Sequence, residues 1–181
     1  MTVADCRGIV EEFDAGADGL ARKSRELTLL LLRHSVAPFS RHQFTPGHVT
    51  CTALVLHPRA AKVLFMYHHR LNRWLLPGGH VEDEDDSPPA AAAREAQEET
   101  QVRLDADVLP VLAGLDVHGI PPKRDEPFHL HHDLIWCFRA MTDEIAATEE
   151  APQVMWAEPA DWDRLAVAES IRNSIARGRL A

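Results

Sequence analysis

A glycine pair followed at a fixed distance by a carboxylate-rich segment is the feature that most constrains this chain. The string GGHVE, residues 78–82, precedes REAQEE, residues 94–99. In an α-helix, Glu95, Glu98 and Glu99 stand at i, i+3 and i+4 and share one face. Three like charges so close together repel one another. The pattern therefore favours a hard divalent cation such as Mg²⁺ or Mn²⁺, which selects carboxylate and carbonyl oxygens and leaves room for water and phosphate.

The residues around the carboxylates predict a helix from about Pro88 to Thr100. Ser87 is a suitable N-cap, and Pro88 fits the first turn, where its missing N–H costs nothing. Ala90 to Ala93 are strong helix formers whose small side chains allow close packing on a neighbouring layer. An acidic string alone is more often a solvated face. The preceding glycines favour a site instead.

These residues resemble the signature of the Nudix hydrolase family, in which a glycine and a spaced glutamate precede an Arg-Glu block on a loop-helix-loop. Gly79 matches the opening glycine, the block from Arg94 to Glu99 matches the central one, and Val102 matches the closing apolar residue. The stretch between glycine and arginine is one residue longer here. Gln101 stands where the family has a glycine, so it either adopts a left-handed conformation at a cost of about 1 kcal/mol or closes the helix differently.

The resemblance implies an α/β fold, namely a Nudix-type α/β/α sandwich with a mixed β-sheet. It also implies a metal-dependent hydrolase that cleaves the diphosphate linkage of a nucleoside diphosphate joined to another moiety, such as a (d)NTP, a nucleotide sugar or ADP-ribose. The expected cofactor is Mg²⁺ or Mn²⁺, and the expected partner is a small nucleotide-like phosphorylated molecule. By resemblance, the metal ligands are Glu95, Glu98, Glu99 and the carbonyl of Gly78.

The resemblance also assigns roles to residues of the preceding loop. Arg94 is expected to tie the helix to this loop, which contains Gly79 and Glu82. The family's spaced glutamate is replaced by Asp86 or, in another register, by Asp85. An aspartate still accepts two hydrogen bonds from a guanidinium group, although from a shorter arm.

The identity of the general base stays open between two places. Some members of the family take it from the signature helix, where Glu98 is the leading candidate, and others take it from a loop before a late strand. Glu149 and Glu150 precede a predicted strand at 153–157, and the resemblance favours Glu150. A solvated turn is an equally good interpretation of this pair.

Substrate-binding candidates lie in several places. In the predicted strand 128–139, His129, His131 and Asp133 alternate on one face, while His132 interrupts the apolar other face. This polar face suits the lining of a pocket better than a zinc site, because a fourth ligand is missing. Further cationic candidates near phosphate are Arg70, Arg73, Lys123 and Arg124.

Hydrophobic patterning predicts a helical extension, residues 1–45, before a Nudix domain at 46–181. The extension contains helices at about 3–13 and 19–34, the second with an apolar stripe of Leu20, Leu27, Leu30 and Leu31. A closing helix is predicted from Pro159 to Arg179, with Leu165, Ala168, Ile171 and Ile175 on its inner face. Strands are predicted at about 49–57, 62–68, 73–76, 108–117, 128–139 and 153–157, the first two forming a hairpin around residues 58–61.

Composition and net charge narrow the possible partners and functions further. The chain has 181 residues, 45% of them hydrophobic, and a net charge of −9, which argues against a long nucleic acid as partner. Three widely spaced cysteines and the lack of a secretion signal or spanning segment predict a reduced, cytoplasmic protein, with a homodimer as one option for its assembly. Two alternatives stay open: a non-catalytic nucleotide sensor, and an isoprenyl diphosphate isomerase, for which Cys51 would be the candidate cysteine.

Overall fold

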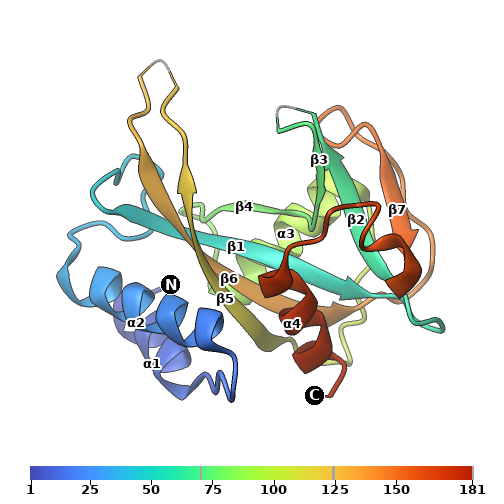
Figure 1. Cartoon of the computed structure of the whole chain (residues 1–181), viewed down its shortest axis with the longest axis horizontal. Helices are drawn as coiled ribbons and strands as arrows, with labels where there is room; N and C mark the ends of the chain where they lie inside the picture. Colours follow the sequence, from blue (N-terminus) through green and yellow to red (C-terminus); the bar gives the residue numbers. More distant parts are fainter. Residues whose placement is uncertain (70, 124, 181) are drawn as a thin grey trace.

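The computed structural model describes residues 1–69, 71–123 and 125–180 (Figure 1). In this described part of the chain, a mixed sheet of seven strands lies between helices, which confirms the predicted α/β class and sandwich layering. In chain order, the elements are α1 (Val3–Glu12), α2 (Gly19–His34), β1 (Gly47–Leu56), β2 (Val63–His68), β3 (Arg73–Leu75), β4 (Gly78–His80), α3 (Pro88–Thr100), β5 (Val111–Ile120), β6 (His129–Arg139), β7 (Val154–Ala157), a 3₁₀ turn η1 (Pro159–Asp161) and α4 (Glu169–Gly178).

Strand β1 is the centre of the sheet. One edge of β1 pairs in parallel with β6 along its whole length, from Gly47 opposite Leu130 to Leu56 opposite Arg139. Its other edge is shared by two antiparallel neighbours, β2 at one end and β4 at the other. Beyond these, β5 pairs with β6, and both β3 and β7 pair with β2. Strands β4 and β6, which carry candidate site residues, are thus both anchored directly on β1.

Alternation along the strands builds two separate cores. On one face, Val49 and Cys51 of β1 and Leu134 of β6 pack with buried residues of α1, α2 and α3. On the other face, Leu54 and Ile135 pack with residues of α4 and the segment before it. Because successive strand residues point to opposite faces, the same strands serve both layers. The helical extension therefore packs on the same sheet face as α3.

Helix α2 does not bury the stripe that its leucines suggested. Of the four leucines in the predicted stripe, Leu31 is buried, but Leu20, Leu27 and Leu30 are exposed. The other buried residues of the helix are Ala21, Ser24, Thr28, Leu29 and Leu32. The physical reason is a polar match with the sheet. The Thr28 hydroxyl lies 3.2 Å from Nδ1 of the buried His132, and the Ser24 hydroxyl accepts a hydrogen bond from the Val117 N–H at 3.0 Å. Burying leucines there would leave these polar groups unpartnered.

The strand predictions hold within a few residues, and the hairpin between β1 and β2 is confirmed by the pairing of Leu56 with Val63. Strand β4 was missed, because three residues around a glycine pair carry no alternation signal. The prediction of the closing helix was wrong over its first half. Leu165 and Val167 are both buried, and Ala166 between them has φ 51°, which no residue of a right-handed helix adopts. Ala168, expected inside, is exposed at the N-cap of α4.

Helix α3 begins and ends as its sequence predicts. The Ser87 hydroxyl accepts a hydrogen bond from the Ala90 N–H at 3.3 Å, and Pro88 occupies the first turn. At the C-terminus, Gln101 adopts the left-handed conformation, with φ 54° and ψ 18°. Of the two possibilities for Gln101, the structure shows the one in which a residue with a Cβ fills a position suited to glycine.

We therefore expect Gln101→Gly to be neutral or to raise the free energy of unfolding by up to about 1 kcal/mol, since glycine adopts this φ without steric cost. Denaturant midpoints at equal m-value measure the change. Gln97→Gly is the matched control, because Gln97 is an exposed interior residue of the same helix and should lose about 1 kcal/mol. A clear loss of stability in Gln101→Gly would contradict the account.

Candidate active site

The carboxylates of α3 lie directly against β4. The Gly78 N–H donates a hydrogen bond to Oε2 of Glu99 at 2.9 Å. A Cβ on Gly79 would come within 2.5 Å of Oε1 of Glu95, closer than real side chains approach. A side chain at residue 79 would therefore displace the carboxylate of Glu95 from its place beside the strand.

The two glycines serve opposite faces of β4. A Cβ on Gly78 would lie 2.6 Å from the Thr52 hydroxyl oxygen and 2.8 Å from the Cys51 carbonyl oxygen, on the side away from Glu95. Gly78 and His80 share that side because strand residues alternate. Strand β4 therefore separates the carboxylates of α3 from a second group of side chains on the sheet face.

Arg94 holds the loop before α3 in place. Its Nε and Nη2 donate to the two oxygens of Asp85 at 3.1 and 2.9 Å, and Nη2 also donates to the carbonyl of His80 at 3.0 Å. Asp85 is buried and also accepts from the Glu82 N–H at 2.9 Å, while Asp86 is exposed. Of the two aspartates that the sequence left open, Asp85 is the one that Arg94 contacts.

Negatively charged side chains are crowded on one face of helix α3. Burial raises the pKa of Glu99 to about 8, and the negative charges of Glu95, Glu150 and Glu98 add to the effect. Burial likewise raises the pKa of Glu95, against the opposing charge of Arg94. Arg94 forms ion pairs of 3.0 Å with both Glu95 and Glu98. The group is an all-oxygen donor set with excess negative charge, which fits Mg²⁺ or Mn²⁺.

The loop before β7 brings Glu150 toward this cluster. The Thr148 hydroxyl donates to the Glu99 carbonyl at 3.1 Å and accepts from the Ala151 N–H at 3.1 Å, which fixes the loop on the end of α3. Glu150 is exposed and close enough for its charge to raise the pKa of both Glu95 and Glu99. Glu149, its neighbour, is also exposed. The charge of Glu150 thus acts on the carboxylates of the helix.

The other substrate-binding candidates are less closely gathered. Arg73 is exposed at the start of β3, and Lys123 is exposed in the turn between β5 and β6, where its backbone pairs with Glu126. Arg70 and Arg124 lie outside the described residues. Among the described residues, neither Arg73 nor Lys123 makes a hydrogen bond or ion pair with the carboxylates of α3.

The histidine candidates form a larger group than the sequence indicated. Nε2 of His129 and Nε2 of His131 lie 3.3 Å apart, and His48 from β1 and His80 from β4 join them. Asp133, on the same face, accepts hydrogen bonds from the hydroxyls of Thr50 and Thr52. The sequence alone missed His48 and His80. His48 lies beside His131 because β1 pairs in parallel with β6. The sequence does not show which strands pair, so this contact could not be predicted.

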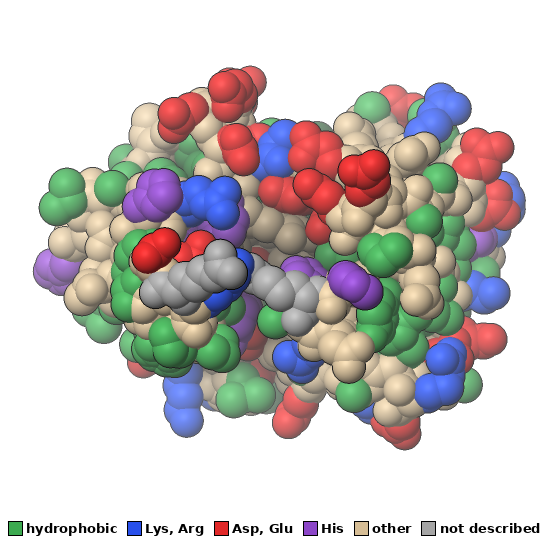
Figure 2. Space-filling view, turned by 90° about the horizontal axis from the view of Figure 1, so that it is seen from above, with side chains coloured by type: hydrophobic (Ala, Val, Ile, Leu, Met, Phe, Trp, Pro, Cys, Tyr) green, Lys and Arg blue, Asp and Glu red, His purple; other side chains and the backbone are tan. Residues whose placement is uncertain are grey.

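The molecular surface shows how these groups lie relative to one another. Figure 2 shows acidic side chains gathered on one rim of a hollow, with a cation among them, and histidine side chains toward the opposite rim.

Comparison with known proteins assigns the family. The sequence matches the NUDIX domain over residues 47–177, which is more than half of the chain. The chain belongs to the NUDIX domain family. A comparison with curated proteins finds no match.

Solved structures agree with this Nudix fold. The NUDIX domain of NrtR from Shewanella oneidensis, solved with ADP ribose, has a TM-score of 0.51 and 20% identity, covering 74% of this chain and 88% of that one. The MutT protein from Methanosarcina mazei Go1 has a TM-score of 0.51 and 18% identity, with coverages of 73% and 92%. The dihydroneopterin triphosphate pyrophosphohydrolase of E. coli has a TM-score of 0.50 and 19% identity, with coverages of 70% and 91%. Identities this low show a shared fold.

The cysteines of this Nudix chain are structural. Cys6, Cys51 and Cys137 are all free and buried, as expected for reduced thiols. Burial raises the pKa of Cys51 well above its ordinary value, and Cys51 points into the core beneath α3. This environment does not suit the reactive cysteine of an isomerase. Among the described residues, no helix is long and apolar enough to cross a membrane.

From the Arg94–Asp85 ion pair we predict that removing the charge of Asp85 lowers the free energy of unfolding. Burial alone would raise the pKa of Asp85, but hydrogen bonds from Arg94 and from the Glu82 N–H outweigh it and hold this pKa below its ordinary value of 3.8. Asp85→Asn should therefore lower the free energy of unfolding by about 2–4 kcal/mol near neutral pH, because it leaves a partly buried guanidinium group short of its partner.

The pH dependence of this loss follows from the sign of the pKa shift. A carboxyl group with a depressed pKa stabilises the fold above pH 3.8 and loses that contribution as the pH falls through its folded value. The difference between wild type and Asp85→Asn should shrink in acid. Asp86→Asn is the matched control and should change stability by less than about 0.5 kcal/mol. Equal losses for the two variants would contradict the assignment of Asp85.

Proposed function

We propose that this Nudix hydrolase cleaves the diphosphate linkage of a small nucleotide-like substrate in a reaction that requires Mg²⁺ or Mn²⁺. The observation that carries the proposal is the carboxylate cluster of α3 pressed against β4, with buried Glu99 bonded to Gly78. Four carboxylates within mutual electrostatic reach destabilise one another unless cations offset their charge.

The residues proposed to hold the cations are Glu95, Glu98, Glu99 and the carbonyl of Gly78. Bound there, divalent cations would lower the pKa of a water molecule and neutralise charge on the diphosphate. Glu99 is oriented by the Gly78 N–H, and Glu95 is held beside Gly79. The chain therefore supplies a preorganised set of oxygen donors.

Two further residues are given separate tasks. Arg94 positions the helix against the loop through Asp85, and it also neutralises part of the charge of Glu95 and Glu98. Glu150 is proposed to take the proton from the attacking water, since its loop is fixed to the end of α3 through Thr148. This exposed carboxylate is free of the strong burial that affects Glu99.

Replacing single metal-binding carboxylates tests the proposal. Glu98→Gln and Glu99→Gln should each lower turnover at least about 100-fold while the folded protein survives, because an amide binds Mg²⁺ far more weakly than a carboxylate. Phosphate release is measured over a panel of nucleoside triphosphates, nucleotide sugars, ADP-ribose and dinucleoside polyphosphates, with Mg²⁺, Mn²⁺ or excess chelator.

The matched control is Gln97→Glu, which makes the reverse exchange of amide and carboxylate on the exposed part of the same helix. This variant should keep most of the activity, because it removes none of the proposed metal ligands. Wild-type rates that persist in excess chelator would contradict metal dependence. Tight nucleotide binding without turnover across the whole panel would instead identify a sensor domain.

The general base is tested by a second pair of variants. Glu150→Gln should cut kcat by roughly 10²–10⁴ with little change in KM, because a base acts on the barrier more than on ground-state binding. Glu149→Gln is the control, since Glu149 is exposed in the same bend, whereas it is the charge of Glu150 that raises the pKa of Glu95 and Glu99. Full turnover in both variants would move the base to the helix, where Glu98 is the candidate.

A further inference from the structure

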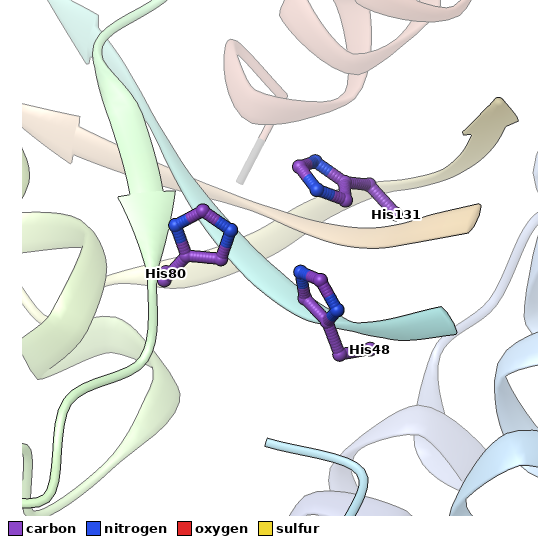
Figure 3. Close-up of side chains that lie close together, drawn as sticks. All are labelled: His48, His80 and His131. Carbon is purple, nitrogen blue, oxygen red and sulfur yellow. The ribbon is translucent and has the colours of Figure 1, made fainter. Parts of the chain in front are cut away.

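Three histidines from three strands converge on one point of the sheet face. His48 comes from β1, His80 from β4 and His131 from β6, and Figure 3 shows their rings turned toward one another. One ring nitrogen of each lies within 4.8 Å of one ring nitrogen of the other two. The pairing of His48 with His131 and of Thr50 with His80 places all three on the same face.

The hydrogen bonds of His48 direct a lone pair into this space. Its Nδ1 lies 3.1 Å from the carbonyl oxygen of Gln43, which accepts only, so Nδ1 carries the proton of the neutral ring. The lone pair is then on Nε2, which is buried and has no hydrogen-bond partner among the described residues. Only 1% of His48 is exposed, so water does not readily satisfy this nitrogen. A histidine fixed through Nδ1 to a carbonyl is the usual arrangement of a metal ligand.

His129 orients His131 in a similar way. Nδ1 of His129 lies 2.8 Å from the carbonyl oxygen of Pro127, so the neutral ring carries its lone pair on Nε2. Nε2 of His131 lies 3.3 Å from that atom and donates to it, which leaves a lone pair on Nδ1 of His131.

The spacing suits a cation that prefers nitrogen. In a tetrahedral site with Zn–N bonds of about 2.0–2.1 Å, the ligand nitrogens lie roughly 3.4 Å apart, so a modest inward rotation of the rings closes the site. The ring centroids of the three histidines are already 4.8 to 5.4 Å from one another. Imidazole ligands select Zn²⁺, Co²⁺, Ni²⁺ or Cu²⁺ over Mg²⁺.

This cluster is separate from the carboxylates. Gly79 faces Glu95, while the adjacent His80 points to the opposite side of β4 with Thr52 and Thr50. Each side of the strand therefore offers a donor set of different chemistry, oxygens on one side and nitrogens on the other.

We propose that His48, His80 and His131 bind one transition-metal ion of the Zn²⁺ class at a second site, distinct from the Mg²⁺ or Mn²⁺ site of α3. Three protein ligands leave a fourth position for water or for an anionic group of a bound molecule.

Titration with Co²⁺ in saturating Mg²⁺ tests the proposal, because Mg²⁺ occupies the carboxylates while imidazole-bound Co²⁺ has a distinct visible spectrum. Wild-type protein should bind one equivalent, displaced by Zn²⁺. His80→Gln and His131→Gln, both at partly buried positions, should bind Co²⁺ at least about 10-fold more weakly. His34→Gln, on the exposed end of α2, is the matched control and should bind as wild type does.

Glu98→Gln separates this site from the catalytic one, and it should retain the Co²⁺ spectrum even if hydrolysis is lost or never detected. Thermal unfolding of each variant checks that the fold survives, and a single folded histidine variant is enough for the comparison. The proposal is overturned if wild type takes up no stoichiometric Co²⁺, if the folded histidine variants bind like wild type, or if Glu98→Gln abolishes the spectrum.

Discussion

The close approach of β4 to α3 is the constraint on which the rest of the site depends. Three residues, Gly78 to His80, pair with one end of β1 while the carboxylates of the helix press on them from one side. A side chain at residue 79 would displace Glu95, and one at residue 78 would strike Thr52 and the backbone of Cys51. The glycine pair thus lets a strand serve as a thin partition between two groups of ionisable side chains.

Contacts with the sheet and with Arg94 hold strand β4 in place. The parallel pairing of β1 with β6 fixes the sheet beneath it, and Arg94 fixes the loop above it through Asp85 and the His80 carbonyl. Arg94 makes a bidentate contact with Asp85 in spite of the aspartate's shorter arm. The charges of the helix face can then be crowded without displacing the helix, which is what a site for divalent cations requires.

Sequence alone was informative where one element carried the whole signal. The caps of α3, the face shared by Glu95, Glu98 and Glu99, and the positions of most strands follow from local spacing and capping chemistry. Sequence reasoning failed where the position of a side chain depends on contact with a residue far along the chain. The buried side of α2 is set by His132, more than a hundred residues away, and the trio of His48, His80 and His131 exists only through strand pairing. The break in the chain before α4 was not predicted, because alanine at position 166 does not indicate a positive φ.

Anomalous diffraction from crystals grown with Mn²⁺ tests the central claim, that β4 presents an oxygen-donor metal site on its α3 side. We predict a peak within coordination distance of the carboxylates of Glu95, Glu98 and Glu99 and of the Gly78 carbonyl, on the side of β4 that faces α3. Mn²⁺ bound only elsewhere on the protein, with none at these carboxylates at saturating Mn²⁺, would contradict the account.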